Sequence, residues 1–293
     1  MGRVSLAWHD LWEPHMSMDT SIKVLYVNPV GFPAYDQVFA DMASKYKYPN
    51  TAVDVASLNP ANVSPKMTDL EFRAYESLII ADTVKAARQA SKDGYDAMII
   101  GCFYDPALAD AREISGETVV VAPCQASTTA ALNIANSFGV IIGEPKWEDQ
   151  MRTAVYEYGY RDKCAGFRDV GLRVEQFHDD PSNTKKLLET AAVDAVRVDK
   201  AESIILGCTL EVGFFEDLQT YLFDRFKAWI PVIDSSIASL KAAENAALQK
   251  KFGWKNSRMW GMSAPPEDEL AKFEIFQDEY QWGNIIHVAA DGS

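Results

Sequence analysis

The chain has little cysteine, a deficit of positive charge and no long apolar run. Four cysteines in 293 residues are too few for a disulfide scaffold, and no two have the Cys-x-x-Cys spacing of zinc or thioredoxin-like sites. The 28 Lys and Arg against 42 Asp and Glu give a formal charge of −14, which argues against nucleic-acid and anionic membrane partners. No window reaches the ~20 apolar residues of a membrane-spanning helix.

Targeting signals and cofactor motifs are also missing from the sequence. Residues 1–20 lack the unbroken apolar core of a secretory signal, because charged residues and histidines interrupt them. We therefore predict a cytoplasmic protein with free thiols. No glycine-rich phosphate-binding sequence and no His-Glu-x-x-His motif is present, so the sequence predicts neither a nucleotide cofactor nor a metal site.

What is present is an alternation of short apolar runs with segments of helical periodicity. Most runs are continuous, as in strands that a parallel sheet buries on both faces. The predicted strands are 22–27, 52–55, 97–100, 118–122, 138–143, 171–177, 203–206 and 231–233. The main predicted helices are 70–92, 128–136, 147–158, 180–199 and 236–251. This alternation indicates an α/β protein with parallel sheets.

The second half of the chain repeats the first. Residues 96–102 (DAMIIGC) align with residues 202–208 (ESIILGC), and residues 120–124 resemble residues 232–236. Two halves with four strands in the same order predict two duplicated Rossmann-like (flavodoxin-like) domains. Each would have a four-stranded parallel sheet, with a pseudo-dyad between the domains and the active site in the cleft between them.

The predicted domain boundaries follow from this repeat. The first α/β domain comprises residues 22–122 and 232–270, and the second comprises residues 123–231. Residues 1–21 would form an N-terminal arm of unknown purpose. Residues 271–293 would form a C-terminal tail that packs on its own domain or on a neighbour.

Two of the four cysteines occupy the same place in each repeat. Cys102 and Cys208 each follow an apolar strand and one glycine, at the strand end where open α/β sheets bind ligands. A thiol there can lie near a helix N-terminus, whose partial positive charge stabilises a thiolate. If the domains face each other, the thiols approach one cleft from opposite sides. That arrangement suits a racemase in which one thiolate removes a proton and the other thiol returns one.

The other two cysteines have no repeat-matched partner. A cysteine at the end of a buried strand is commonly just a small apolar residue of the core. We expect Cys164 to be structural, while the role of Cys124 stays open.

Five further residues are candidates for substrate binding. Asn28, at the end of the first predicted strand, could hydrogen-bond a substrate carbonyl or serve as an ordinary turn residue before proline. The backbone N–H groups of Phe103 and Thr209 follow the two cysteines and could hold a developing enolate oxygen. Ser127 and Thr128, at the start of a predicted helix, could contact a carboxylate or imide, or act only as helix caps.

These motifs resemble those of the hydantoin and allantoin racemases, within the cofactor-independent aspartate/glutamate racemase superfamily. GCFYDPAL at residues 101–108 is similar to the family's first cysteine motif, and ILGC at residues 205–208 to its second. Asn28-Pro29 is similar to the opening substrate loop. The resemblance covers roughly residues 22–266. It implies a pair of catalytic cysteines, no pyridoxal phosphate, no metal, a small-molecule substrate and a homo-oligomer.

The chain departs from the family pattern at three places. After Asn28-Pro29 the family usually has Asn and then Thr or Ser, but this chain has Val30 and Gly31. After the second cysteine it has Thr209 where the hydantoin racemases usually have a small residue, and Gln125 stands where a Glu is common. We expect a racemase of a 5-substituted hydantoin or a related ureide such as allantoin. The alternatives are an amino-acid racemase, or a cis–trans isomerase or decarboxylase of the same superfamily. Outside the enzymes, a non-catalytic thiol or ligand-binding protein is the alternative.

Overall fold

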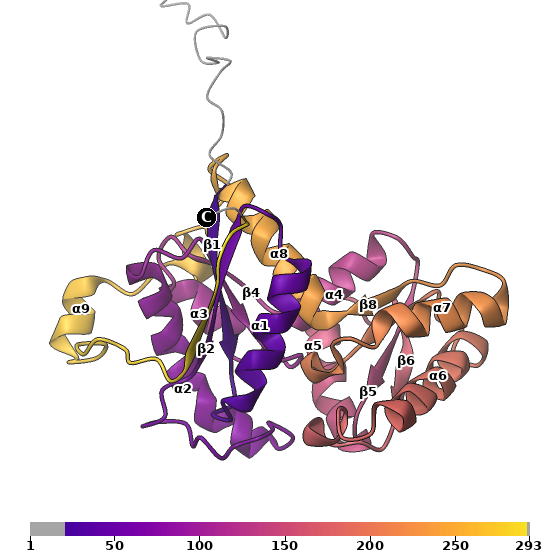
Figure 1. Cartoon of the computed structure of the whole chain (residues 1–293). Helices are drawn as coiled ribbons and strands as arrows, with labels where there is room; N and C mark the ends of the chain where they lie inside the picture. The colour runs from indigo at the N-terminus through magenta and orange to yellow at the C-terminus, as the bar shows by residue number, and fades with distance from the viewer. Residues whose placement is uncertain (1–20, 292–293) are drawn as a thin grey trace, which may run out of the picture.

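The computed structural model describes residues 21–291, which form two α/β units beside each other (Figure 1). The predicted N-terminal arm, residues 1–21, lies outside the described residues apart from Ser21. The first unit is built on a five-stranded sheet of order β4-β3-β1-β2-β9, in which only β9 is antiparallel. Its strands are β1 (Ile22–Asn28), β2 (Thr51–Ser57), β3 (Ala97–Ile100), β4 (Val119–Val121) and β9 (Ile285–Val288).

The second unit is built on a four-stranded parallel sheet of order β6-β5-β7-β8. Its strands are β5 (Phe138–Ile142), β6 (Cys164–Asp169), β7 (Ser203–Leu206) and β8 (Val232–Asp234). Equivalent strands of the two repeats take the same order in both sheets. The prediction of an α/β fold with parallel sheets in two units is therefore confirmed, with β9 as an additional edge strand of the first sheet.

Helices cover the faces of both sheets, and their ends follow from local sequence. They are α1 (Ala34–Tyr46), α2 (Arg73–Lys92), α3 (Leu108–Ile114), α4 (Pro123–Leu132), α5 (Glu148–Glu157), α6 (Pro181–Arg197), α7 (Phe215–Phe226), α8 (Ser235–Lys250) and α9 (Glu267–Lys272). Asp180 begins α6 by accepting a hydrogen bond from the Asn183 N–H, with proline at the first helical position. The central strands β3 and β7 are fully buried, which explains their continuous apolar sequences.

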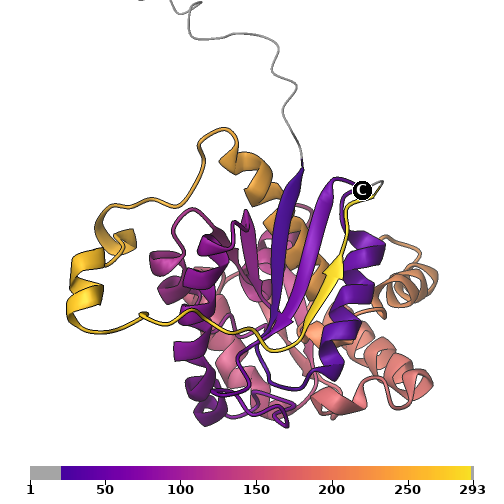
Figure 2. The same ribbon diagram turned by 60° about the vertical axis from the view of Figure 1, so that its left-hand side comes forward.

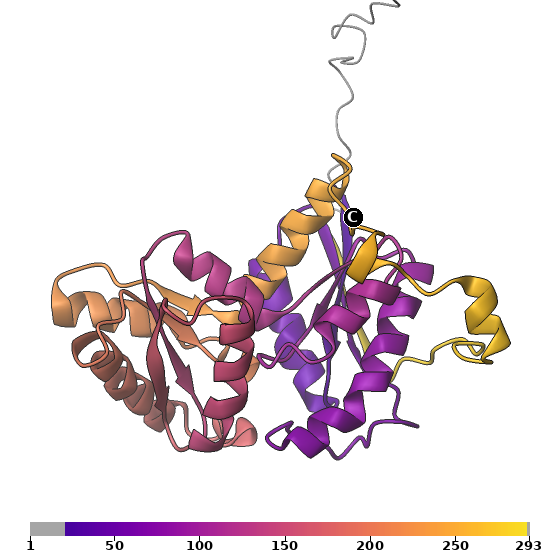
Figure 3. The same cartoon turned by 180° about the vertical axis from the view of Figure 1, so that it is seen from behind.

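The chain returns to the first unit through α8. The sequence predicts that residues 232–270 belong to the first domain, but β8 pairs with β7 in the second sheet. Asp234 ends β8 and begins α8, accepting hydrogen bonds from the Ser236 and Ile237 N–H groups. From there α8 packs along β1, β3 and β4 and contacts α4, as the view from behind shows (Figure 3). The change of sheet therefore occurs at Asp234 rather than before residue 232.

One predicted strand was wrong. Residues 171–177 form a loop with a short 3₁₀ helix, Val174–Gln176, and the strand in this part of the chain is β6. Strand β6 lies at the edge of its sheet and is only partly buried, so its sequence lacks the continuous apolar run of the inner strands. In this loop Leu172 and Val174 are partly buried against the core while Arg173 and Glu175 are exposed, which accounts for the alternation without a strand.

The C-terminal segment runs across the first unit and ends as strand β9 on β2 (Figure 2). Part of the predicted tail, residues 271–293, is thus a strand of the first sheet. None of the helices in residues 21–291 is long and apolar enough to cross a membrane.

Candidate active site

Both repeat-matched cysteines line one cavity where the two units meet. It lies at the carboxyl ends of β1, β3 and β7 and has a volume of about 500 Å³, open mouth included. Asn28, Phe103 and Thr209 line the same cavity. Most of the remaining wall is apolar or aromatic, with Tyr35, Leu70, Tyr104, Trp147, Met151 and Leu210. The structure therefore brings five of the seven predicted site residues together.

A glycine positions each cysteine by allowing close packing at the strand end. A Cβ on Gly101 would lie 2.6 Å from the Tyr26 ring, and a Cβ on Gly207 would lie 2.7 Å from the Val140 side chain. Both distances are shorter than real Cβ contacts. The turns before the two cysteines thus pack in the same way against the neighbouring strand of their sheet, β1 for Gly101 and β5 for Gly207.

A hydrogen-bonded chain joins the two cysteine turns. The Thr209 hydroxyl donates to the Gly101 carbonyl at 3.1 Å, and the Ser236 hydroxyl donates to the Thr209 carbonyl at 2.9 Å. The Tyr26 hydroxyl lies 3.2 Å from the Ser236 hydroxyl. All these groups are buried. Sequence reasoning proposed only the backbone N–H of Thr209 and missed its side chain.

The surroundings of both thiols favour the neutral form over the thiolate. Burial raises the pKa of Cys102, although a hydrogen bond from the Tyr104 N–H acts against it. Burial also raises the pKa of Cys208, and the nearby Glu211 carboxyl acts in the same direction. The expected stabilisation of a Cys102 thiolate by a helix N-terminus is not seen, because α3 begins only at Leu108 and desolvation dominates.

The polar atoms of Asn28 are already engaged within the protein. Its amide N–H₂ donates to the Phe32 carbonyl at 3.1 Å and to Asp36 Oδ1 at 2.8 Å, and its oxygen accepts from the Val30 N–H at 3.2 Å. Asn28 therefore shapes the loop that follows β1, which forms one wall of the cavity. Its predicted contact with a substrate carbonyl would compete with these bonds.

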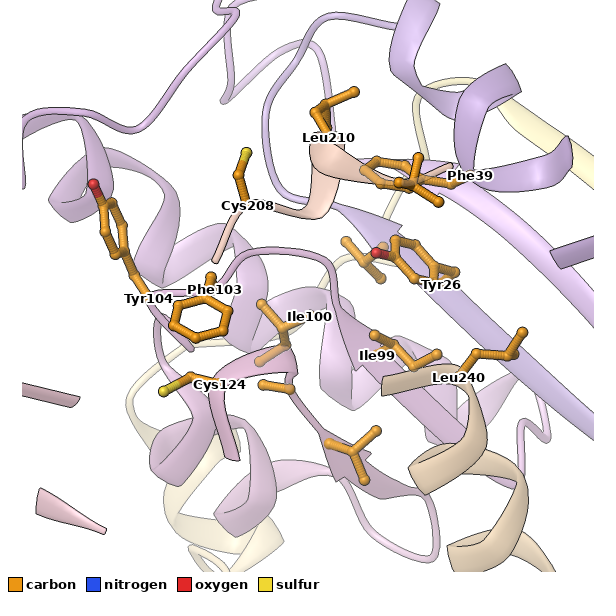
Figure 4. Close-up of a cluster of buried hydrophobic side chains, with 14 of the residues drawn as sticks. Tyr26, Phe39, Ile99, Ile100, Phe103, Tyr104, Cys124, Cys208, Leu210 and Leu240 are labelled. Atoms are coloured by element: carbon orange, nitrogen blue, oxygen red, sulfur yellow. The ribbon is translucent and has the colours of Figure 1, made fainter. Parts of the chain in front are cut away.

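Ser127 and Thr128 do not line the cavity. Both are fully buried in α4, and their hydroxyls donate to the carbonyls of Pro123 and Cys124 within the same helix. Because both hydroxyls are used within α4 and neither reaches the cavity, Ser127 and Thr128 are core residues of a helix and not part of the candidate site. Cys124 is also buried outside the cavity, with the Phe103 ring between it and Cys208 in the view of Figure 4.

Asp105 is a residue that sequence reasoning missed. It lies in the turn after Cys102 with a φ of 51°, the left-handed region in which Asp is tolerated. Its carboxyl accepts from the N–H groups of Cys124 and Gln125 at 2.8 and 2.9 Å and from the Tyr158 hydroxyl at 2.7 Å. Burial raises its pKa to about 7. Asp105 thereby joins the first cysteine turn to α4 and to the second unit. Its position within the GCFYDPAL motif is the feature of the sequence that could have identified it as a site residue.

Glu211 holds the second cysteine turn through contacts within the turn itself. Its side chain accepts a hydrogen bond from the Cys208 N–H at 3.1 Å, and its own N–H donates to the Cys208 carbonyl. It is completely buried, and burial raises its pKa well above the usual value. This reciprocal pair fixes the backbone on both sides of the Cys208 thiol.

Two buried polar atoms in the cavity wall have no hydrogen-bond partner among residues 21–291. They are the Tyr35 hydroxyl and the Trp147 indole N–H. A buried polar group without a partner is costly, so these atoms can contribute to binding if a ligand supplies the partner.

Comparison with known proteins identifies the family of the chain. A hydantoin racemase of Pseudomonas sp. (strain NS671) is 30% identical over 209 residues, covering 71% of this chain and 80% of the relative. A hydantoin racemase of Paenarthrobacter aurescens is 27% identical over 249 residues, covering 85% of this chain and 99% of the relative. Enzymes with these names are isomerases, as the sequence predicted for this chain.

Solved structures agree on the fold. The allantoin racemase of Pseudomonas fluorescens is similar with a TM-score of 0.72 at 22% identity, covering 84% of this chain and 98% of that one. The allantoin racemase of Klebsiella pneumoniae has a TM-score of 0.70 at 23% identity, covering 84% and 95%. The family model described as Asp/Glu/Hydantoin racemase matches residues 24–243, which include both cysteine turns and the cavity between them. The chain therefore belongs to the Asp/Glu/Hydantoin racemase family.

Proposed function

We propose that this protein is a two-thiol racemase of a 5-substituted hydantoin or a related ureide. One observation carries the proposal: Cys102 and Cys208 follow equivalent strands of the two units and line the same cavity. A racemase must remove a proton from one face of a carbon and add one to the other face. Two thiols from opposite units fit that requirement, whereas a decarboxylase needs only one proton donor.

The proposed reaction exchanges protons without other reactants. The thiolate of one cysteine takes the proton from C5 of the ring, and the C–H electron pair moves into the adjacent carbonyl to form an enolate. The thiol of the other cysteine then protonates C5 on the opposite face as the carbonyl re-forms. The two cysteines end with their protonation states exchanged, and the reverse enantiomer uses them in reverse order. The proposal needs no cofactor or metal, because the adjacent carbonyl already acidifies C5–H.

The cavity wall suits such a ring. The backbone N–H groups of Phe103 and Thr209 are candidates to hold the enolate oxygen. The Tyr35 hydroxyl and the Trp147 N–H, both without partners among residues 21–291, are candidates to bind the ring carbonyls. The predominantly apolar wall favours a 5-substituent that is itself apolar. A cytoplasmic location and a homo-oligomer remain part of the proposal, and light scattering on the purified protein would test the latter.

The test follows both enantiomers in D₂O. Wild type, Cys102→Ser and Cys208→Ser are incubated with each enantiomer of several 5-substituted hydantoins and of allantoin, while optical rotation and C5 deuteration are recorded. Wild type should racemise with deuterium uptake. Each single variant should lose racemisation by about 100-fold or more while retaining exchange with one enantiomer.

Two controls isolate the cavity thiols. Cys164→Ser removes a thiol that begins β6 and does not line the cavity, so it should racemise like wild type. A sample without enzyme gives the spontaneous rate. Full racemisation by either Cys102→Ser or Cys208→Ser would overturn the two-thiol assignment.

A further inference from the structure

The buried carboxylate of Asp36 connects a cavity residue to the C-terminal segment. Asn28 donates to Asp36 Oδ1 at 2.8 Å, Ser57 donates to Oδ2 at 2.7 Å, and Asn284 donates to Oδ2 at 3.0 Å. Asp36 is fully buried near the start of α1. Burial raises its pKa, while these three hydrogen bonds act in the opposite direction. Each donor therefore matters to the balance at this carboxylate.

Asn284 belongs to a segment, residues 280–288, that we call the C-terminal strap. The strap contains β9 and lies outside the residues that the family model matches. The N–H of Gly283 donates to the Ser57 carbonyl at 3.0 Å, and the N–H of Ser57 donates to the Asn284 carbonyl at 3.0 Å. A Cβ on Gly283 would lie 2.8 Å from the Leu58 carbonyl, so the close approach of strap and β2 requires glycine here. Asn284 is thus held at a defined position beside the end of β2.

The ends of the strap are also bound to the first unit. The Tyr280 hydroxyl accepts from the Asn59 N–H at 2.8 Å and donates to Asp82 Oδ2 at 2.5 Å. At the other end, His287 Nδ1 contacts Asp54 Oδ1. Figure 2 shows the strap running across the unit to its place along β2. These contacts leave Asn284 little freedom to move away from Asp36.

The connection reaches the cavity through Asn28. The same amide that donates to Asp36 also binds the Phe32 carbonyl and the Val30 N–H. Asn28, Val30 and Tyr35 all line the cavity. A shift of Asp36 would therefore move the wall that these residues form. The path from strap to cavity consists of two side-chain hydrogen bonds, Asn284 to Asp36 and Asn28 to Asp36.

We propose that Asn284 is a positioning residue for the cavity: through Asp36 it holds Asn28 and the loop after β1 in the conformation that receives the substrate. The catalytic part of this inference rests on the racemase function proposed above. The structural part, control of the loop by the strap, does not. Because Asn284 acts on the wall and not on the thiols, its loss should weaken substrate binding more than it slows the chemical step.

The experiment compares Asn284→Ala with two variants of the same strap. His287→Ala removes a strap contact that does not involve Asp36, and Gln281→Ala changes an exposed side chain that bonds only to the Glu279 carbonyl. Asn284→Ser keeps a shorter donor and serves as the milder variant if Asn284→Ala is poorly folded. Thermal melting establishes that each variant is folded before the other measurements.

Two measurements distinguish positioning from general stabilisation. Amide hydrogen exchange at Val30, whose N–H is held by Asn28, should be about tenfold faster in Asn284→Ala and unchanged in His287→Ala and Gln281→Ala. KM for the hydantoin should rise about five- to tenfold in Asn284→Ala with kcat within about twofold of wild type.

Each outcome separates the two proposals. If Asn284→Ala leaves Val30 exchange at the wild-type rate, the strap does not control the loop and the inference is wrong. Equal acceleration in His287→Ala would also overturn it, because the effect would then come from loosening the strap in general. If wild type racemises nothing while Val30 exchange still responds to Asn284→Ala, the proposed function fails and control of the loop stands.

Discussion

The hydroxyl of Thr209 donates to the carbonyl of Gly101, so the residue after one catalytic candidate binds the residue before the other. The bond crosses between the two units and is buried on both sides. Cys208 is therefore connected to Cys102 through the Thr209 side chain and the Gly101 backbone alone, and the connection does not pass through the rest of either sheet. The bond therefore connects the two cysteine turns directly across the two units.

Replacing Thr209 by Val should disturb catalysis more than folding. Valine keeps the shape and removes the donor, which costs about 1–3 kcal/mol of unfolding free energy for a buried bond. If the bond sets the thiol separation, kcat should fall by about tenfold or more. Urea unfolding and racemisation assays measure both effects. Thr220→Val, whose hydroxyl bonds the Glu216 carbonyl on exposed α7, is the matched control and should change neither. A Thr209→Val enzyme with unchanged kcat would contradict this role.

The glycines before the cysteines should not tolerate alanine. In Gly101→Ala the new Cβ would lie 2.6 Å from the Tyr26 ring and 2.7 Å from the Val27 carbonyl. The strand end must shift, at a cost of about 1–3 kcal/mol, and racemisation should fall because Cys102 moves with it. Gly261→Ala is the control, since nothing lies within 4 Å of its added Cβ. The melting temperature and the racemisation rate of the two variants test this prediction. If Gly101→Ala matches Gly261→Ala in both, the packing argument is wrong.

The pH dependence of racemisation should reflect the buried thiols. Burial raises the pKa of Cys102 and of Cys208, so at neutral pH both are mostly protonated and the thiolate base is scarce. Below those pKa values, each pH unit increases the thiolate fraction about tenfold. We expect log kcat/KM to rise with a slope near one between about pH 7 and pH 9. The Cys102→Ser/Cys208→Ser double variant supplies the blank for spontaneous racemisation. A profile already flat at pH 7 would show that the base is ionised in the free enzyme.

Asp105 should make stability depend on pH between about 4 and 7. Burial raises its pKa to about 7, against about 3.9 in an unfolded chain. The folded state binds this proton more tightly, so its contribution to stability is complete below about pH 4 and is lost as the pH rises to 7. Asp234, whose pKa burial raises to about 6, acts in the same sense.

The variant Asp105→Asn is neutral at every pH and keeps the left-handed backbone conformation. Its unfolding free energy should fall less steeply than that of wild type between pH 4 and 7 in urea titrations. Asp110→Asn, on the exposed side of α3, makes the same change of charge away from the site and should leave the wild-type slope in place. If the unfolding free energy of wild type and of Asp105→Asn falls equally steeply between pH 4 and 7, Asp105 is not the source of the pH dependence.

The sequence predicted the inner strands and the cysteine pair because both leave local signals. Strands such as β3 and β7 are buried on both faces and therefore appear as unbroken apolar runs. The glycine before each cysteine is required by a close contact one residue from the strand end, so the apolar-Gly-Cys pattern occurs in both repeats. The two cysteine motifs are also the residues on which the resemblance to the racemase family rests.

Other features depend on contacts between distant residues and left no local pattern. Strand β6 is a partly exposed edge strand, and the four residues of β9 become a strand only because β2 offers an open edge. Ser127 and Thr128 have the composition of a binding site, but their hydroxyls are used within α4. The partners of Asp36 come from β1, β2 and the strap, and no spacing in the sequence indicates that they meet.

Because β9 comes last in the sequence, the first sheet can be completed only at the end of synthesis. The ribosome delivers β1 to β4 first, but the strand that covers the β2 edge is delivered after the whole second unit. At usual rates of translation this interval is on the order of ten seconds. During this interval the β2 edge of the first sheet has no partner strand and is exposed to neighbouring chains. Asp36 also lacks the hydrogen bond from Asn284 until that residue has been synthesised. If Asn284 positions the loop after β1 as proposed, this wall of the cavity reaches its final form only after β9 has been made, although its residues are among the first to be synthesised.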